Sequence, residues 1–365
     1  MKRLLLSGYY GYGNAGDEAV LAGLLTGFRA SASAADLELT VLSGNPSETR
    51  TAHGVDAVDR YRPSALLPAI AHCDLFLSGG GSLLQDVTSA HGIFYYLGVV
   101  RLAQMLGKKT MFIAQGIGPL KLARSRKLVA SVANKLSAIT VRDPDSAQLL
   151  REIGVIRPPI EVTADPALLL SPSPIPSNSP RIGGRGASSF GVALRPWHGQ
   201  EEIGAQVTDA CFSSLGTQKP LLIPMQPASD TPVAEQFRQK WALLSGQANA
   251  ATLCTATDGL GPLLSIIAGC DMMVGMRLHA LILAAAAGVP SVALSYDPKV
   301  TAFMQSSGQG DAVYDLNAPL DTLTSLLARV WAERLARAAA LDAALPGLRA
   351  QATRNIEIAL KQLSL

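Results

Sequence analysis

Hydrophobic residues recur along the chain in short unbroken runs, each followed by a glycine-rich or polar turn and then by a segment with helical spacing. Such runs predict strands buried on both faces, as in a parallel sheet covered by helices. The predicted strands are residues 2–7, 37–43, 73–78, 110–114, 138–142, 160–164, 190–194, 220–224, 271–274 and 291–295. Helices are predicted over residues 17–29, 261–268 and 278–287, and over the alanine- and leucine-rich tail 320–365.

A change of composition divides this repeating pattern in two. The stretch from Ser171 to Pro180 alternates proline with serine and asparagine, and a glycine-rich piece follows. Proline neither pairs in a central strand nor continues a helix, so we interpret residues 171–189 as a linker. It separates two Rossmann-like α/β domains, residues 1–170 and 190–345, and residues 346–365 are predicted as a C-terminal helix. Ligands of such sheets bind at the carboxyl ends of the strands, so we expect a cleft between the domains.

The bulk composition excludes several classes of protein. The 365 residues are 48% hydrophobic and 16% charged with a net charge of +3, which gives no indication of a nucleic-acid partner. The four cysteines form no C-x-x-C pair and the histidines no cluster, so no metal site is expected. The longest apolar stretch, residues 278–289, is too short to span a bilayer, and we expect a cytoplasmic protein.

The turn after the first predicted strand reads Gly11-Tyr12-Gly13-Asn14-Ala15-Gly16, the form of a dinucleotide fingerprint. The second predicted strand lacks the terminal carboxylate that would hold the ribose, which argues against a dinucleotide. Asp17 and Glu18 follow at the start of the helix. They either cap that helix or place one carboxylate in the cleft, where it binds or deprotonates a sugar hydroxyl.

A second turn, Gly275-Met276-Arg277-Leu278-His279, joins a predicted strand to a helix. An arginine in the first turn of a helix is unfavourable by about 0.3–1 kcal/mol, because the helix N-terminus already carries partial positive charge. Together with free backbone N–H groups, Arg277 and His279 would suit a phosphate. They can share a ligand only if the helix begins between or just before them. The alternative is a surface arginine beside a core histidine.

Further cations follow other predicted strands, namely Arg142, Arg195 and Lys299. Each alone is equally well explained by an ion pair, and Asp143 and Asp145 lie next to Arg142. Together the cations suggest a ligand with two or more negative charges.

The turn Gly79-Gly80-Gly81-Ser82 would let a ligand oxygen approach the backbone, or would simply join a strand to a helix that Ser82 caps. Asp165 either reaches the cleft or starts a turn. No G-x-S-x-G elbow is present, so serine-hydrolase chemistry is unsupported.

In combination, the segments 8–18, 79–82, 141–143, 194–197 and 275–279 resemble the polysaccharide pyruvyltransferase family, and most closely its bacterial cell-surface branch, which modifies S-layer-anchoring wall polymers. The resemblance implies a GT-B-like fold. It implies transfer of the pyruvyl group of phosphoenolpyruvate to a sugar of a cell-surface polysaccharide or exopolysaccharide, or of a lipid-linked precursor. The product is a cyclic ketal, phosphate is released, and no cofactor is needed.

The resemblance places phosphoenolpyruvate in the C-terminal domain and the acceptor in the N-terminal domain. The predicted phosphoenolpyruvate ligands are Arg142, Arg195, Arg277, His279 and Lys299. The predicted catalytic residues are His279 as acid, and Asp17 or Glu18 on the acceptor side. The predicted acceptor-binding residues are Tyr12, Asn14, Gly80, Gly81 and Ser82.

Two other functions compete with this one. A GT-B glycosyltransferase that uses a nucleotide-diphosphate sugar would share the architecture, but would need a ribose-binding carboxylate after the helix 278–287, where only Asp297 is available. A non-enzymatic saccharide-binding protein would need no set of cations. Arginines in the C-terminal tail suggest a peripheral contact with anionic lipid at the inner face of the membrane. The sequence does not specify the acceptor sugar or the oligomeric state.

Overall fold

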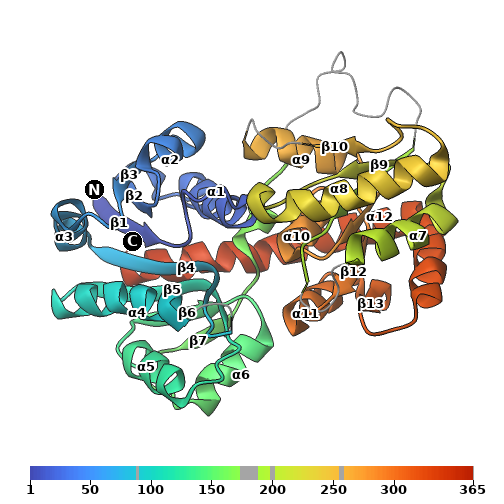
Figure 1. Ribbon diagram of the computed structural model, residues 1–365. Helices are drawn as coiled ribbons and strands as arrows, with labels where there is room; N and C mark the ends of the chain where they lie inside the picture. Colours follow the sequence, from blue (N-terminus) through green and yellow to red (C-terminus); the bar gives the residue numbers. More distant parts are fainter. Residues whose placement is uncertain (88–89, 173–187, 198–201, 255–258, 365) are drawn as a thin grey trace. The chain divides into compact units, whose positions relative to one another are not determined.

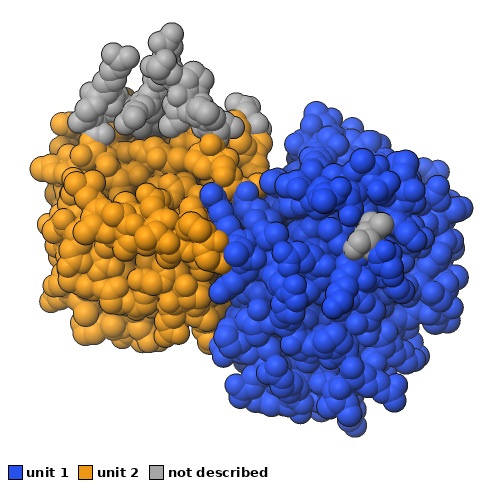
Figure 2. Space-filling model, turned by 180° about the vertical axis from the view of Figure 1, so that it is seen from behind, with its two compact units in different colours: residues 1–169, 349–365 blue, residues 170–348 orange. Residues whose placement is uncertain are grey.

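The computed structural model describes residues 1–87, 90–172, 188–197, 202–254 and 259–364. The chain forms two compact units, coloured separately in Figure 2. Unit 1 contains Met1–Leu169 together with Arg349–Leu365, and unit 2 contains Leu170–Leu348. Most of the predicted linker, residues 173–187, lies outside the described residues.

Unit 1 is built on a seven-stranded parallel sheet with the order β3-β2-β1-β4-β5-β6-β7 (Figure 1). Its strands are β1 (Lys2–Ser7), β2 (Leu37–Ser43), β3 (Asp56–Asp59), β4 (Leu75–Leu84), β5 (Lys109–Ile117), β6 (Ala138–Val141) and β7 (Ile160–Val162). Its helices are α1 (Ala15–Ala30), α2 (Pro46–His53), α3 (Pro63–His72), α4 (Ala90–Met105), α5 (Ala123–Ala133) and α6 (Pro144–Glu152), and 3-10 turns lie at Ala34–Asp36 and Pro166–Leu169.

Alternate residues of the central strands enter two separate cores, one on each face of this sheet. Leu5 packs in one core with residues of α4 and α5, such as Leu97 and Val129. Leu4 and Leu6 pack in the other with α1 and the end of the chain. The chain leaves β1 toward β2 and later returns to β4 on the other side, so the order of the strands reverses between β1 and β4. That reversal is the usual ligand position in an open α/β sheet.

Unit 2 repeats the design with a six-stranded parallel sheet of order β10-β9-β8-β11-β12-β13. Its strands are β8 (Ser189–Ala193), β9 (Lys219–Leu222), β10 (Thr252–Leu253), β11 (Met272–Gly275), β12 (Ser291–Ser295) and β13 (Val313–Asp315). Its helices are α7 (Ile203–Leu215), α8 (Pro227–Ser245), α9 (Leu260–Ala268), α10 (Leu278–Ala286) and α11 (Pro298–Ser306), followed by a 3-10 turn at Gly310–Ala312. Here the strand order reverses between β8 and β11.

The final helix, α12 (Leu320–Gln362), begins in unit 2 and ends in unit 1. The segment predicted as a separate C-terminal helix, residues 346–365, instead belongs to this longer helix up to Gln362, with Pro346 inside it. Asn355 is fully buried and accepts hydrogen bonds from the hydroxyls of Thr140 (2.6 Å) and Thr163 (2.8 Å). Its amide group donates to the carbonyl of Ala164 (2.9 Å). This network fixes the end of α12 to strand β6 and to the segment that follows β7.

The structure confirms two parallel α/β sheets, and every strand predicted from the apolar runs is present within a few residues. The prediction that Ser82 caps a helix is wrong. Strand β4 continues through the triple glycine to Leu84, because Gly81 still pairs with Gln115 and Leu84 with Ile117 across a bulge. None of the described helices is both long and apolar enough to cross a membrane.

Candidate functional site

The glycine-rich turn of unit 1 lies where β1 ends and α1 begins. Asn14 is the N-cap of α1, and its side-chain oxygen accepts the backbone N–H groups of Gly16 (3.0 Å) and Asp17 (3.4 Å). The capping role is thus filled by Asn14, and Asp17 and Glu18 stand in the first turn, where the helix dipole favours carboxylates.

Glu18 is held by the turn itself. One carboxylate oxygen accepts the N–H of Gly11 (2.8 Å), and the other lies 2.8 Å from Nε2 of His53. The side chains of Glu18 and His53 are 19% and 6% exposed. His53, which carries no signal in the sequence, therefore joins the end of α2 to this turn. Both oxygens of Glu18 are engaged, so a structural role explains it better than chemistry.

Asp17 faces the triple glycine of β4. A Cβ atom added to Gly81 would stand 2.8 Å from Oδ1 of Asp17, and one added to Gly80 would stand 2.6 Å from the hydroxyl of Tyr10. Gly80 and Gly81 also adopt φ values of 76° and 147°, which favour glycine. Glycine at position 81 thus lets the Asp17 carboxylate approach the strand, and glycine at position 80 leaves room for Tyr10. Asp17 is 9% exposed at the point of strand reversal.

Arg142, at the end of β6, forms a buried ion pair. Its Nη1 donates to Oδ2 of Asp165 (2.8 Å) and its Nη2 to the hydroxyl of Ser82 (2.7 Å). The side chains of Arg142 and Asp165 are 6% and 3% exposed. Neither of the adjacent aspartates is the partner, since Asp143 caps α6 by accepting the N–H of Ser146. Asp165 also accepts the N–H of Ala167 (3.0 Å), so it both starts a turn and reaches the strand ends.

The structure thus brings the candidate site residues of the N-terminal domain to one edge of the unit 1 sheet. Asp17 contacts Gly81, and Ser82 contacts Arg142, whose guanidinium also lies 3.1–3.2 Å from where a Cβ atom on Gly116 would be. Arg142 therefore belongs to unit 1, with the predicted acceptor residues, while the other predicted phosphoenolpyruvate ligands belong to unit 2.

A group of tyrosines surrounds Arg60 beside this edge. Arg60 is 1% exposed and donates to the carbonyl of Gly8. Burial lowers its pKa, but the surrounding tyrosine hydroxyls outweigh that effect and raise it. Tyr12 stacks on Tyr9 with 4.4 Å between ring centroids, and its hydroxyl lies 2.6 Å from that of the exposed Tyr61. The rings within 4.8–5.7 Å of the guanidinium are those of Tyr12, Tyr61, Tyr95 and Tyr96.

In unit 2, Arg277 is bound to a carboxylate that sequence analysis missed. Its Nε donates to Oδ2 of Asp230 (3.0 Å), and its Nη2 donates to Oδ1 of Asp230 and to the hydroxyl of Ser229 (3.0 Å). Asp230 is fully buried in the first turn of α8, and the Arg277 side chain is 16% exposed. Arg277 is therefore no surface arginine. Its remaining nitrogen, Nη1, forms no hydrogen bond with the described part of the chain.

Helix α10 begins between Arg277 and His279. Arg277 is its N-cap with extended backbone angles (φ −73°, ψ 118°), and Leu278 is its first residue. That is the geometry that a shared ligand requires. His279 is partly exposed in the first turn, where N–H groups of the backbone lack helical partners.

Two more predicted cations follow strands next to β11. Arg195 comes after β8, and its Nη1 donates to the hydroxyl of Tyr296 (3.2 Å). Its guanidinium lies 5.1 Å from the ring of Tyr296 and 5.9 Å from that of Trp197. Lys299 stands in the first turn of α11 after β12. Since β8, β11 and β12 are neighbours, Arg195, Arg277 and Lys299 belong to one edge of the sheet.

Asp297, the possible ribose ligand of a nucleotide-sugar enzyme, caps α11 by accepting the N–H of Lys299 (3.0 Å). One of its carboxylate oxygens is thus used by the fold. Among the described residues, no three His, Cys, Asp or Glu side chains are grouped as metal ligands. The four cysteines are buried, and burial raises the pKa of Cys73 and of Cys254 to about 11.

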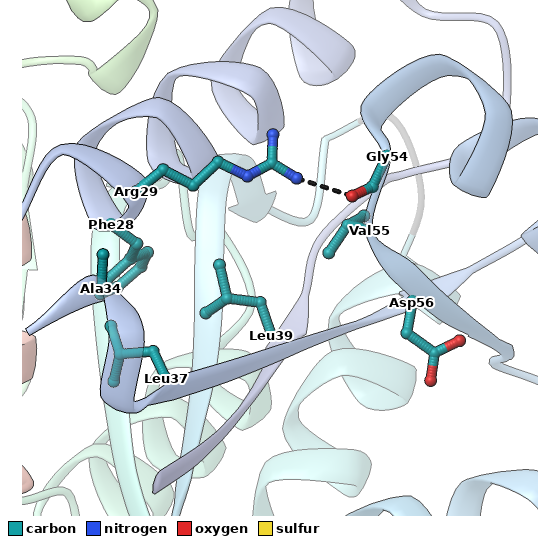
Figure 3. Close-up of a pocket in the computed structure, with 8 residues that line it drawn as sticks. All are labelled: Phe28, Arg29, Ala34, Leu37, Leu39, Gly54, Val55 and Asp56. Atoms are coloured by element: carbon teal, nitrogen blue, oxygen red, sulfur yellow. Dashed lines mark hydrogen bonds between the residues drawn. The ribbon is translucent and has the colours of Figure 1, made fainter. Parts of the chain in front are cut away.

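A pocket of about 220 Å³ lies elsewhere in unit 1, at the starts of β2 and β3 (Figure 3). It is lined mostly by apolar side chains such as Phe28 and Leu39, and Arg29 donates to the carbonyls of His53 (2.9 Å) and Gly54 (2.8 Å). This pocket is at the amino ends of the strands, opposite the predicted site, and is smaller than the 300–1,000 Å³ typical of ligand pockets. We do not assign the chemistry to it.

Comparison with known protein families shows to which family the chain belongs. The profile of the family described as polysaccharide pyruvyl transferase matches residues 14–298. The chain belongs to the polysaccharide pyruvyl transferase family. The match runs from Asn14 in the glycine-rich turn to Pro298 at the start of α11, so it includes nearly all of the candidate residues. A comparison with curated proteins finds no match.

Solved structures similar to this chain share the GT-B fold. The Anabaena HepE protein in complex with UDP is 16% identical with a TM-score of 0.64, and its complex with UDP-glucose gives 13% and 0.67. Both comparisons cover 100% of each chain. The Neisseria meningitidis UDP-GlcNAc 2-epimerase bound to UDP-GlcNAc is 11% identical with a TM-score of 0.63, covering 99% of this chain and 100% of the other. At these identities the likeness concerns the fold alone.

Proposed function

We propose that this protein transfers the pyruvyl group of phosphoenolpyruvate to two hydroxyls of one sugar, forming a cyclic ketal and releasing phosphate. The observation that carries the proposal is the set of cations that follow three neighbouring strands of unit 2: Arg195, Arg277 and Lys299. Phosphoenolpyruvate bears a carboxylate and a phosphate, and fixed guanidinium groups suit both. Membership of the pyruvyl transferase family supports the same reaction class.

Arg277 is well prepared to bind an oxyanion. Asp230 holds its Nε and Nη2 edge in place, so the remaining Nη1 is oriented before a ligand arrives. Fixed donors need not reorganise during the reaction, which makes them more effective than mobile ones. The phosphate would accept from Nη1 of Arg277, from the N–H groups at the start of α10, and from His279.

The reaction balances with an acid and a base and needs no cofactor. His279 donates a proton to the methylene carbon of phosphoenolpyruvate, and a sugar hydroxyl attacks the adjacent carbon as a base takes its proton. The bond between that carbon and the phosphate oxygen then breaks, a second hydroxyl of the same sugar attacks the carbon, and its proton passes to the departing phosphate. Both new C–O bonds close the ketal ring.

We assign the acceptor to unit 1, at the edge that carries Asp17, Gly81 and Ser82. Asp17 is the better candidate base, because its carboxylate lies against Gly81 at the reversal of strand order, whereas Glu18 is bound to Gly11 and His53 within the turn. Tyr12 and Asn14 complete the predicted acceptor set. Motif resemblance supports the bacterial cell-surface branch, with an S-layer-anchoring wall polymer or its lipid-linked precursor as the acceptor and a cytoplasmic site of action.

Release of phosphate from phosphoenolpyruvate, measured with a panel of hexose and N-acetylhexosamine β-glycosides, tests the proposal. His279→Ala should lower turnover about 100-fold or more while the protein still melts cooperatively. His72→Ala is the matched control, since His72 is an exposed histidine whose ring lies 2.7 Å from the carbonyl of Pro68 in the same helix. Unchanged turnover in His279→Ala would exclude its role as acid.

A nucleotide-sugar glycosyltransferase is the second candidate, favoured by the UDP bound in the structurally similar HepE protein. The use of Asp297 as a helix cap speaks against it, because that is the carboxylate available for a ribose. Thermal-shift measurements with phosphoenolpyruvate, UDP-glucose and GDP-mannose separate the two. Stabilisation by the nucleotide sugars and not by phosphoenolpyruvate would overturn the pyruvyl transfer.

A further inference from the structure

Two loops that follow β4 and β5 in unit 1 carry an unusual combination of exposed side chains. Both oxygens of Asp86 accept backbone N–H groups of the second loop, from Lys121 (2.7 Å) and Leu122 (2.9 Å). The guanidinium of Arg124 lies 5.8 Å from the ring of Phe94 on the neighbouring α4. With Val87, next to Asp86 in the chain, and Lys127, one helical turn after Arg124, the exposed residues of these segments make up what we call the basic-apolar patch: Val87, Phe94, Lys121, Leu122, Arg124 and Lys127.

The apolar members are large side chains that the fold leaves in solvent. Val87 is 52% exposed, Phe94 41% and Leu122 37%. Single exposed hydrophobic residues are ordinary, but several together mark a surface that something covers.

The cationic members lack the partners that surface cations usually find. None of Lys121, Arg124 and Lys127 lies within salt-bridge distance of a carboxylate in the part of the chain that the structure describes. Two of them stand in the first turns of α5, which has no acidic residue there. Cations at that end of a helix oppose its dipole, so stability does not explain their presence. The nearby Asp86 is directed to backbone amides instead.

We propose that the basic-apolar patch binds the surface of an anionic lipid bilayer. Apolar side chains that enter the headgroup region, flanked by cations that attract acidic lipids, are the chemistry of interfacial membrane binding. A protein partner with an acidic face would use the cations but would leave no reason for Phe94 and Leu122 to be exposed beside them.

The position of the basic-apolar patch in unit 1 suggests what a contact with lipid would do. Residues 85–87 follow β4, which carries Ser82, and residues 121–122 follow β5 (Figure 1). The patch therefore lies on these loops and on the first turns of α4 and α5, at the carboxyl ends of the two strands. A membrane held there would meet the edge of the unit 1 sheet to which we assign the acceptor. The lipid contact itself goes beyond the proposed function and does not depend on it.

Co-sedimentation of the full chain with vesicles tests the inference in the absence of phosphoenolpyruvate. The protein should bind vesicles of equimolar phosphatidylcholine and phosphatidylglycerol more tightly than vesicles of phosphatidylcholine alone, and added salt should weaken binding. Each cation near an anionic surface contributes about five-fold in binding, equivalent to about 1 kcal/mol. Lys121→Gln/Arg124→Gln/Lys127→Gln should therefore reduce binding roughly a hundredfold.

Two further variants distinguish binding by the basic-apolar patch from non-specific attraction between a cationic protein and anionic vesicles. Phe94→Ser/Leu122→Ser should weaken binding several-fold while keeping its dependence on salt. Ile156→Ser/Arg157→Gln removes an exposed apolar residue and an exposed cation elsewhere in unit 1 and should bind like the wild type. Circular dichroism melts check that all variants fold.

Three outcomes would overturn the proposal: no preference of the wild type for anionic vesicles, equal binding by the triple variant, or tighter retention on polyuridylate than on vesicles. Turnover with a water-soluble acceptor glycoside is measured in parallel. The patch variants should leave that turnover unchanged, so failure of the lipid contact is distinguishable from failure of pyruvyl transfer.

Discussion

Replacing Asp230 with asparagine removes the buried negative charge that faces Arg277 in unit 2. The Asp230 carboxylate accepts from Nε and Nη2 of Arg277, from the N–H of Gln226 (3.0 Å) and from the hydroxyl of Ser229 (2.8 Å). An asparagine of nearly the same size has only one acceptor oxygen, and its NH2 group would point at donors. The guanidinium would remain 16% exposed without a counter-charge.

Breaking a buried ion pair by removing one partner costs about 3–5 kcal/mol. For a unit of this size, each kcal/mol lowers the melting temperature by about 2–4 °C, so Asp230→Asn should lower the unfolding transition of unit 2 by about 6–20 °C. Differential scanning calorimetry measures this directly. Asp209→Asn is the matched control, because Asp209 pairs with Lys240 on α8 but both side chains are about a third exposed or more, and exposed pairs contribute about 0–1 kcal/mol.

The double variant Asp230→Asn/Arg277→Gln completes a thermodynamic cycle. Loss of both charges removes the uncompensated guanidinium, so the double variant should be more stable than the sum of the single changes by about 2 kcal/mol or more. A change in melting temperature below about 2 °C for Asp230→Asn, or strictly additive effects, would refute the inference that Asp230 holds Arg277.

Three other predictions concern stability. Gly81→Ala should destabilise the protein by about 1–3 kcal/mol in urea unfolding, because φ is 147° and Oδ1 of Asp17 is in the way, whereas Gly98→Ala in α4, with open space around it, should be neutral or stabilising. Asn355→Ala should cost about 2–4 kcal/mol, because the Thr140 hydroxyl loses its acceptor, the Ala164 carbonyl loses a donor, and Thr163 keeps only its longer bond to the carbonyl of Val141 (3.2 Å). A loss below about 1 kcal/mol would contradict the network. Arg337 and Arg329 hold the pKa of Asp311 well below its usual range, so the ionised carboxylate stabilises the fold above about pH 4, and this stabilisation is lost as the pH falls further. At pH 7, Asp311→Asn should therefore be about 1 kcal/mol less stable than the wild type. The difference in stability between the two proteins should narrow toward about pH 2.

The apolar runs predicted the central strands because each of these strands is buried on both faces. A continuous run of apolar residues therefore identifies such a strand from its own sequence. The strands that escaped prediction lie at or near the sheet edges and are short, as in Asp56–Asp59 with its polar ends, and Thr252–Leu253. An edge strand has fewer buried positions, so its sequence differs little from that of a loop.

In the candidate site, too, the sequence predicted what depends on local features and missed the contacts between distant residues. The sequence located Arg277 and His279 because a local rule, the charge at the start of a helix, was broken there. It could not find Asp230, which precedes Arg277 by 47 residues in a polar stretch that looks like an ordinary helix start. For the same reason Arg142 was matched with its neighbours Asp143 and Asp145, while the true partner Asp165 follows the next strand.

The path of α12 has a consequence for synthesis on the ribosome. Residues 1–169 of unit 1 leave the ribosome before unit 2. The core of unit 1 also includes Ile356, Ala359 and Leu363, which belong to the end of α12 and the residue after it. The hydroxyl of Thr140 has its acceptor, Oδ1 of Asn355, only after this part of the helix has been made. At about 5–20 residues per second, the intervening unit 2 takes roughly 10–40 s to translate. The first half of the chain therefore stays incomplete, with part of an apolar face of its sheet open to chaperones, until the residues of α12 that complete this core have been made.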